Sequence, residues 1–271
     1  MYLPTATKKQ DLEALKKIYK SIPGINETQL FKNICRECDD KVFNSIENID
    51  TTLKPFTNKE YSLYALKILL HDIYIKEYCC CLDNLNHLNI TGHGSIHLDW
   101  LADIKDMTNN ANYYIGALEN HAYVNHSVII DKVIEKKVNF ACVTKLLLGQ
   151  SYTGKPLYNL YDYGVPFGFV YIVVLPIDDM HTKVSMFYRK KHKIYNVLKS
   201  EFDDMTLDGK LQAISNLIIM HTEDFTCTKC VIDKLKKIRK IVSEEVSDFS
   251  IEKYLKRIDY LNKSGINLFE I

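Results

Sequence analysis

The chain has 271 residues, of which 46% are hydrophobic and 25% charged, and its formal net charge is +1 at pH 7. This length and composition are typical of a soluble globular protein with a sizeable buried core. The near-zero net charge argues against a protein that is basic over its whole surface, although a local basic patch remains compatible with it. No apolar run approaches the roughly 20 residues that span a bilayer, and the first residues lack the apolar core of a signal peptide.

The cysteine content points to a reducing compartment. Eight cysteines are present, but their spacing is not that of a small secreted disulfide framework. Cys79, Cys80 and Cys81 are consecutive, and adjacent thiols rarely all find disulfide partners. We therefore expect reduced cysteines, a cytoplasmic (intracellular) location and no association with a membrane.

Three helical segments are expected at the start of the chain. The first follows a capping box at Thr7 and ends before Pro23. The second starts near Asn26 and carries an apolar residue on every turn. The third opens at a capping box at Thr57 and runs to about Cys81 with little polar face. We therefore expect this third helix to be central and buried.

The middle of the chain has a different character. Residues 87–100, HLNITGHGSIHLDW, alternate around a Gly-His-Gly sequence and predict a small hairpin. Residues 106–112, DMTNNAN, predict a polar loop. Helical patterns resume at residues 113–118 and 128–134, whereas the apolar residues 140–148 fit either a strand or a short helix.

Residues 167–188 carry the strongest strand signal. The first nine, FGFVYIVVL, are uncharged and rich in β-branched and aromatic types, which is typical of a strand covered on both faces. A PIDDM turn follows, and residues 182–188 then alternate polar and apolar types, as in a strand with one buried face. This pattern predicts an antiparallel hairpin in which Phe169, Tyr171 and Val173 are buried.

After the hairpin, the expected elements are all helices, at residues 195–202, 208–218, 227–242 and 251–261. We therefore predict an α+β fold that is predominantly helical, with helices packed around a small antiparallel sheet centred on a hairpin at 167–188. In the absence of a convincing linker, residues 1–271 are expected to form a single domain. A subdivision near residue 107 is the alternative.

Two Cys-x-x-Cys pairs form the first candidate site. They are Cys35–Cys38 and Cys227–Cys230, and four thiolates in two such pairs are a common ligand set for structural zinc. The alternative is that each pair lies on the apolar face of a helix, because residues i and i+3 share a face and buried cysteine behaves as a small hydrophobe. We therefore expect no cofactor, with structural zinc at these cysteines as the alternative.

Histidines and acids form a second candidate site, which consists of His71, Asp72, His93, His97 and Asp99. A His-Asp pair on an apolar helix, followed by further histidines and an acid, resembles in outline the HD-type metal phosphohydrolases. That resemblance implies a divalent ion that lowers the pKa of a bound water. The pattern departs from the family because no histidine precedes His71. A metal-dependent phosphohydrolase using residues 71–99 is the alternative function.

Residues 149–155, GQSYTGK, match the first seven positions of a phosphate-binding loop. The eighth position of that loop is a Ser or Thr whose hydroxyl binds Mg²⁺, and here it is Pro156. We therefore interpret the match as coincidental.

Basic residues cluster at the end of the hairpin and in the penultimate helix. They are Arg189, Lys190, Lys191, Lys193, Lys236 and Lys237. Cations beside aromatic residues have the composition that binds a phosphate backbone or stacks on bases, although each run also fits a solvated face. We favour a non-enzymatic interaction or regulatory protein whose partner is a polyanion such as nucleic acid, or else a protein. Enzymatic activity and oligomeric state are left open.

Overall fold

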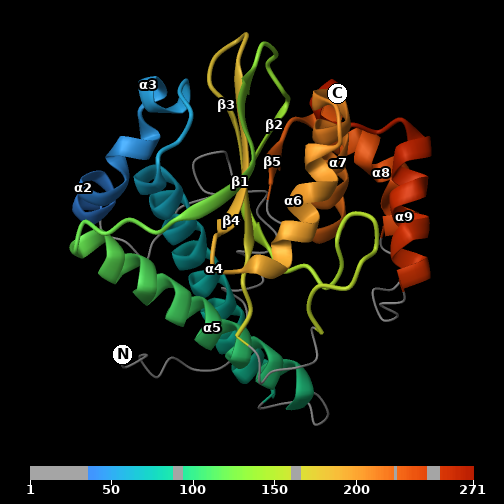
Figure 1. Cartoon of the computed structure of the whole chain (residues 1–271). Coiled ribbons are helices and arrows are strands. Elements are labelled where there is room, and N and C mark those ends of the chain that lie inside the picture. Colours follow the sequence, from blue (N-terminus) through green and yellow to red (C-terminus); the bar gives the residue numbers. More distant parts are fainter. Residues whose placement is uncertain (1–35, 88–93, 160–165, 223–224, 243–250) are drawn as a thin grey trace.

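The centre of the protein is a five-stranded antiparallel sheet with the strand order β1-β4-β3-β2-β5 (Figure 1). The computed structural model describes residues 36–87, 94–159, 166–222, 225–242 and 251–271. The strands are β1 (His126–Ile134), β2 (Phe140–Leu146), β3 (Val170–Pro176), β4 (Thr182–Arg189) and β5 (Thr226–Cys227).

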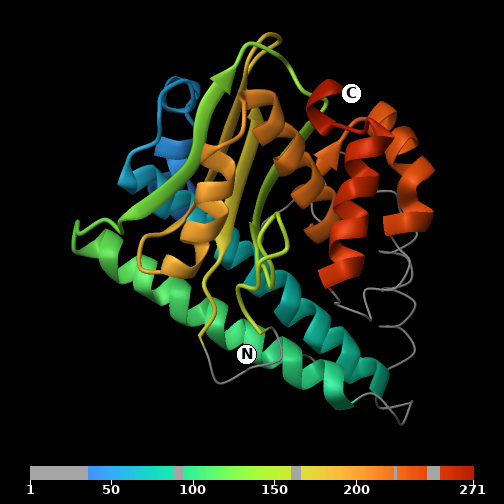
Figure 2. The same cartoon turned by 45° about the vertical axis from the view of Figure 1, so that its right-hand side comes forward.

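Helices cover both faces of this sheet. Those on one face are α2 (Arg36–Glu47), α3 (Ile49–Thr52), α4 (Asn58–His87) and α5 (Gly94–Glu119). Those on the other are α6 (Asn196–Asp203), α7 (Leu207–His221), α8 (Lys229–Val242) and α9 (Ile251–Ser264), together with the short 3-10 helices η1 (Lys193–Tyr195) and η2 (Leu268–Glu270). Figures 1 and 2 show the blue-to-green helices on one side of the sheet and the orange-to-red helices on the other, with α4 and α5 side by side.

Successive residues of the central strands point into two separate cores, because side chains alternate between the faces of a sheet. Met186 packs in the core shared with Leu217 of α7. Its neighbour Phe187 packs in the core shared with Leu69 of α4 and Tyr114 of α5. A strand between two helical layers is therefore buried on both faces.

The predicted fold is wrong in its account of the sheet. The hairpin itself is confirmed, because β3 and β4 pair antiparallel from Val170–Tyr188 to Pro176–Thr182. However, β1, β2 and β5 extend it to five strands, so the sheet is not a small one centred on residues 167–188. The protein is an α+β fold whose sheet separates two groups of helices.

Three of the predicted elements in the middle of the chain are replaced by one strand and one helix. Residues 128–134 were expected to be helical, yet they belong to β1 and pair with β4. Seven residues are too few to separate the two periodicities, and β-branched residues favour the strand once a partner strand is available. The hairpin expected within residues 87–100 and the loop at 106–112 are also wrong, because one continuous helix, α5, begins at Gly94. Residues 88–93 lie outside the described part.

The loop predicted at residues 106–112 is part of a helix because α5 buries only a narrow apolar stripe and is polar elsewhere. Met107, Ala111 and Tyr114 recur at helical spacing and are buried against α4 and the sheet. The asparagines between them were interpreted as loop residues, but tertiary packing outweighs their weak local preference. Residues 140–148, for which either a strand or a helix was expected, contain the strand β2. The helix expected at residues 227–242 begins at Lys229 as α8, because Cys227 is the last residue of β5.

Other expectations are confirmed. Phe169, Tyr171 and Val173 are buried, and they share a core with α4. One of the two hydrogen bonds of the capping box at the start of α4 is formed, because the backbone N–H of Thr57 donates to the carboxylate of Glu60. The helices expected at residues 195–202, 208–218 and 251–261 correspond to α6, α7 and α9. The expected single domain and its alternative subdivision stay predictions.

The expectation that β4 has one exposed face is wrong. All eight of its residues are buried, including Lys183 and Arg189. The reason is that α4, α5 and the residues between α3 and α4 cover the face that was expected to meet solvent. Among the helices that the structure describes, none has the length and apolar character needed to cross a membrane.

Candidate functional site

Arg189, at the end of β4, is a buried cation. Its side chain lies beneath α5, and the residue is only 2% exposed. Its Nη1 donates a hydrogen bond of 2.8 Å to Oδ1 of Asn110. The guanidinium carbon lies 3.8 Å from the ring centroid of Tyr113 and 5.6 Å from that of Tyr114. Two aromatic rings and one amide oxygen thus surround the positive charge.

The charge of Arg189 has no carboxylate partner among the described residues, and Nε and Nη2 have no hydrogen-bond acceptor there. Burying a guanidinium without a counter-charge costs several kcal/mol, of which cation–π contacts return about 2 kcal/mol or somewhat more. Buried arginines are therefore normally paired with an acid. This one faces neutral groups.

The neighbouring titratable groups respond to this charge. Burial, followed by the positive charge of Arg189, lowers the pKa of His126 to about 3. Burial, Arg189 and Lys191 together lower the pKa of His192 to about 4. Burial and Arg189 likewise hold the pKa of Lys191 below its ordinary value. The potential around the end of β4 is therefore positive.

The surface above Arg189 carries further cations. Lys190, Lys191 and Lys193 are exposed, and they form no ion pair with any described residue. The Nζ of Lys191 lies 5.4 Å from the ring centroid of Tyr113, and Tyr113 is itself 52% exposed. We call this region the α5–β4 cationic surface and define it by Tyr113, Arg189, Lys190, Lys191 and Lys193. Its four basic residues were predicted from the sequence as one run, but Arg189 is buried beneath the ring of Tyr113, whereas the three lysines are exposed.

The predicted cations of the penultimate helix do not join this surface. Lys236 lies on α8, where it is paired with Asp233 at 3.3 Å, and the side chain of Lys237 lies outside the described part. α8 packs through Val231 on the face of the sheet opposite α5. The two basic runs are therefore separate.

The predicted His/Asp cluster begins on α4 with His71 and Asp72, whose Nδ1 and Oδ1 lie 3.5 Å apart. Oδ2 of Asp72 lies 3.2 Å from Nζ of Lys145 on β2. Burial raises the pKa of Asp72, but the hydrogen bond from His71 and the charge of Lys145 outweigh it and leave this pKa below its ordinary value. The carboxylate is therefore already neutralised by a cation of the protein.

The other members of this cluster lie elsewhere. His93 falls outside the described residues, and His97 and Asp99 lie on α5, with side chains that are not described. The pairing of Lys76 with Asp103 fixes how the antiparallel helices α4 and α5 lie against each other. Position 99 is then opposite about position 80, which is about 12 Å along the axis from Asp72 at 1.5 Å per residue. The backbone does not bring these positions to one place.

The cysteine pairs are only partly described. Cys35 lies outside the described residues, and Cys38 is on α2 with an undescribed side chain. Cys227 ends β5, where burial raises the pKa of its thiol, and Cys230 is exposed on α8. Within the described part of the chain, no three His, Cys, Asp or Glu side chains are placed to hold a metal ion. Zinc therefore stays a prediction, which elemental analysis of the purified protein would test.

The loop at residues 149–155 does hold an anionic group, but this group belongs to the protein. Oε1 of Glu201 accepts hydrogen bonds of 2.7 Å from the Ser151 hydroxyl and 2.5 Å from the Thr153 hydroxyl. The Nζ of Lys155 lies 3.9 Å from the same oxygen. The donors of a sequence that resembles a phosphate-binding loop are thus directed at the carboxylate of α6.

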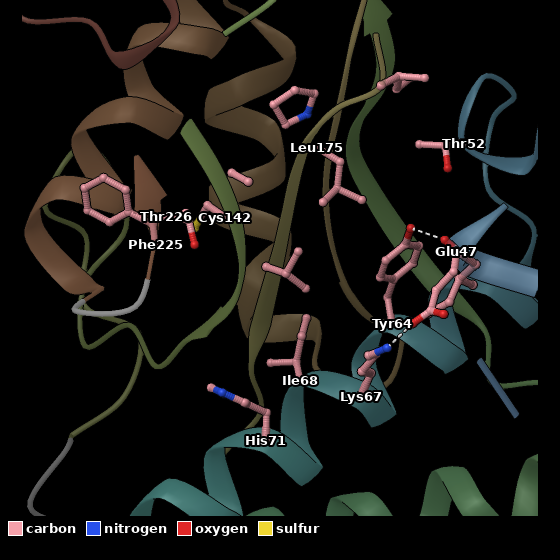
Figure 3. Close-up of a pocket in the computed structure, with 15 residues that line it drawn as sticks. Glu47, Thr52, Tyr64, Lys67, Ile68, His71, Cys142, Leu175, Phe225 and Thr226 are labelled. Carbon is pink, nitrogen blue, oxygen red and sulfur yellow. Dashed lines mark hydrogen bonds and ion pairs between the residues drawn. The ribbon is translucent and has the colours of Figure 1, made fainter. Parts of the chain in front are cut away.

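An apolar cleft of about 490 Å³ lies between helices α2–α4 and strands β2, β3 and β5 (Figure 3). Its apolar wall includes Ile68, Cys142, Leu175 and Phe225. Its polar side chains include Glu47, Thr52, Lys67, His71 and Thr226. Figure 3 shows the ion pair between Lys67 and Glu47 on one side of the cleft and His71 at its base. The size and apolar lining are typical of a small-molecule site, but this pairing leaves little net charge in the cleft.

Comparison with known proteins assigns the chain to no family. No protein-family model matches it, and neither a curated protein nor a solved structure is significantly similar to it. Its function must therefore be inferred from the geometry of its own residues.

The sequence analysis did not identify the residues of α5 and β1 that lie around Arg189. Asn110 and Tyr113 precede Arg189 by more than seventy positions, and His126 reaches it only through the pairing of β1 with β4. The run of basic residues was a visible signal. Tyr113 and Asn110 carry no such signal in the sequence, because their contacts with Arg189 depend on how α5 crosses the sheet.

The low pKa of His126 predicts a loss of stability in acid. Its pKa is about 3 in the folded protein and about 6.5 in an unfolded chain, so the unfolded state binds more protons between these values. Stability is fully present above pH 6.5 and is lost as the pH falls toward 3. This histidine alone should cost about 2 kcal/mol of unfolding free energy between pH 7 and pH 5.

Urea unfolding of the wild type and of His126→Gln at both pH values would measure this effect. The variant cannot titrate, although its amide still reaches the Tyr114 hydroxyl that now lies 3.0 Å from Nε2. Its loss between pH 7 and pH 5 should be about 2 kcal/mol smaller than that of the wild type. Equal losses in the two proteins would mean that His126 titrates normally when folded.

Proposed function

We propose that the protein is a non-enzymatic intracellular interaction protein that binds nucleic acid, preferentially single-stranded, on the α5–β4 cationic surface. One observation carries this proposal. The buried Arg189 and the exposed Lys191 lie beside the exposed ring of Tyr113, two further exposed lysines follow in the same short segment, and no described carboxylate is paired with any of these cations.

The physical basis is the release of counterions from a phosphate backbone. Each phosphate that a lysine neutralises frees condensed cations, so affinity comes from unpaired positive charge on the surface. Lysines already paired with acids, such as Lys256 with Glu252 on α9, have less to gain. The exposed ring of Tyr113 adds a face on which a base can stack, and stacking favours single strands because their bases are accessible.

The other candidate sites support this function less well. The charged groups around the apolar cleft are paired within the protein, and positions 72 and 99 of the His/Asp cluster lie apart along α4 and α5. A metal-dependent phosphohydrolase would need these residues to converge on one ion. We therefore keep it only as the alternative function.

The proposal predicts that Lys190→Ala combined with Lys191→Ala weakens binding to all sequences alike. Two lost phosphate contacts should reduce the slope of log affinity against log salt by about 1.4 for single-stranded nucleic acid. The unfolding free energy should change by no more than about 0.5 kcal/mol per substitution, because both side chains are exposed. Fluorescence anisotropy with labelled oligonucleotides at several salt concentrations would measure the slope.

Lys256→Ala is the matched control, since it removes an exposed lysine from α9. It should leave both affinity and slope close to those of the wild type. If the wild type binds neither single- nor double-stranded oligonucleotides at low salt, where screening is weakest, the surface is only a solvated face and the proposal fails.

A further inference from the structure

The guanidinium of Arg189 presents an unused bidentate edge. Nη1 is held by Oδ1 of Asn110, whereas the two nitrogens without an acceptor are Nε and Nη2. The N–H bonds of these two nitrogens point in the same direction. This edge of arginine is one that makes two parallel hydrogen bonds to a carboxylate or a phosphate. The edge is thus already oriented, because Asn110 holds the opposite side of the group.

We propose that Arg189 anchors the terminal phosphate of a bound strand, with Tyr113 as the side chain that covers the anchor. This inference rests on the proposed function and adds which group of the ligand is recognised. Arg189 is only 2% exposed, so a phosphate must pass the ring of Tyr113 to reach it. A phosphate inside a strand continues into sugars on both sides and is hindered from entering. A terminal phosphate has one ester bond and three free oxygens.

The surroundings of Arg189 suit an anion. His126 and His192 are neutral at pH 7, because burial and the positive charges nearby lower their pKa values to about 3 and about 4. Lys191 adds a positive charge beside Tyr113. A terminal phosphate carries between 1.5 and 2 negative charges at pH 7, roughly, against one for an internal phosphate, so it gains more from this potential.

Tyr113 has the geometry of a cover that can move. Its ring stacks on the guanidinium at 3.8 Å, yet the residue is 52% exposed, so one side of the ring faces solvent. Rotation of an exposed side chain is fast and does not disturb the core. The same ring can then stack on the terminal base, which links the anchor to the rest of the cationic surface.

The test compares one short single-stranded oligonucleotide with a 5′-phosphate, with a 3′-phosphate and with neither, using a label placed inside the strand. The wild type should bind at least one phosphorylated form about tenfold to a hundredfold more tightly than the unphosphorylated strand, as expected for hydrogen bonds to a charged group. Arg189→Lys keeps the charge but lacks the fork, so the three strands should bind it within about twofold of one another.

Lys190→Ala is the matched control, because this exposed lysine lies outside the anchor. It should weaken all three strands by a similar factor and preserve the preference for the terminal phosphate. Tyr113→Ala should also preserve the preference, since it removes the cover and not the fork. Arg189→Lys alters a buried group and can reduce folding. The ratio of the affinities for the phosphorylated and unphosphorylated strands is therefore also measured in the wild type and in Tyr113→Ala, where the buried arginine is intact.

The outcomes separate this inference from the proposed function. If the wild type binds all three strands with equal affinity, the anchor is overturned while nucleic-acid binding stands. If no strand binds but a nucleoside 5′-monophosphate does, and Arg189→Lys abolishes that binding, the anchor stands for a small phosphorylated ligand and the proposed function fails. Absence of binding in both assays overturns both.

Discussion

Asp131→Ala is expected to lower the unfolding free energy by about 3–5 kcal/mol, because it leaves a buried lysine without its counter-charge. Asp131 lies on β1 and Lys183 on β4, and the side chain of Lys183 is only 1% exposed. Nζ of Lys183 and Oδ1 of Asp131 are 2.5 Å apart. Burial of an ammonium group has a large desolvation cost, so a buried lysine either has a counter-charge or loses its proton.

The pair also holds the start of α4 against the sheet. Oδ2 of Asp131 accepts hydrogen bonds of 2.8 Å from the Tyr61 hydroxyl and 2.6 Å from the backbone N–H of Phe56. Nζ of Lys183 donates to the carbonyl of Lys54 and lies 4.1 Å from the ring centroid of Phe56. Removal of the carboxylate therefore leaves three donors without their acceptor, which adds to the cost.

Urea denaturation followed by tyrosine fluorescence or circular dichroism would measure the change. The double variant Asp131→Leu, Lys183→Met should lose less stability than Asp131→Ala alone, because both charges are then removed together. Asp233→Ala breaks the exposed pair with Lys236 and should change stability by less than about 1 kcal/mol. A loss of under 1 kcal/mol, roughly, for Asp131→Ala would mean that Lys183 reaches water in solution.

The ion pair between Asp131 and Lys183 could not be predicted from the sequence. The alternating residues of β4 correctly predicted a strand, and its pairing with β3 followed from the turn between them. Lys183 was assigned to a solvent face because a lysine at a polar position usually lies there. Its burial depends on Asp131, fifty-two positions earlier, on a segment that was expected to be helical. Local patterns could not supply that pairing.

For the candidate site, as for β4, the sequence predicted the local segment but not its contacts with distant residues. The run that contains Lys190, Lys191 and Lys193 is visible in the sequence, and the structure places these three residues on the surface. What distinguishes this surface from a solvated face is Arg189 beneath Tyr113, and that contact joins β4 to a helix whose polar stretch was interpreted as a loop. A contact of this kind depends on the crossing of two elements and has no local signature.

Phe187→Ala is expected to lower the unfolding free energy by about 3–5 kcal/mol, the usual cost of removing a buried phenylalanine. The ring centroid of Phe187 lies 4.6 Å from that of Tyr61, 5.3 Å from that of Tyr171 and 5.4 Å from that of His126. The substitution would thus open a cavity at the centre of the core beneath α4 and α5 and remove several aromatic contacts.

The same substitution decides between the two descriptions of β4. In a half-buried strand with Val184 and Met186 directed inward, Phe187 would face solvent, and its loss would cost about 0.5 kcal/mol or less. In a strand between two helical layers, both Phe187→Ala and Met186→Ala are costly, the latter by about 2–5 kcal/mol. Met180→Ala, in the turn before β4 and 68% exposed, is the control. A large effect for Met186→Ala alone would contradict the cover that α4 and α5 provide on this face.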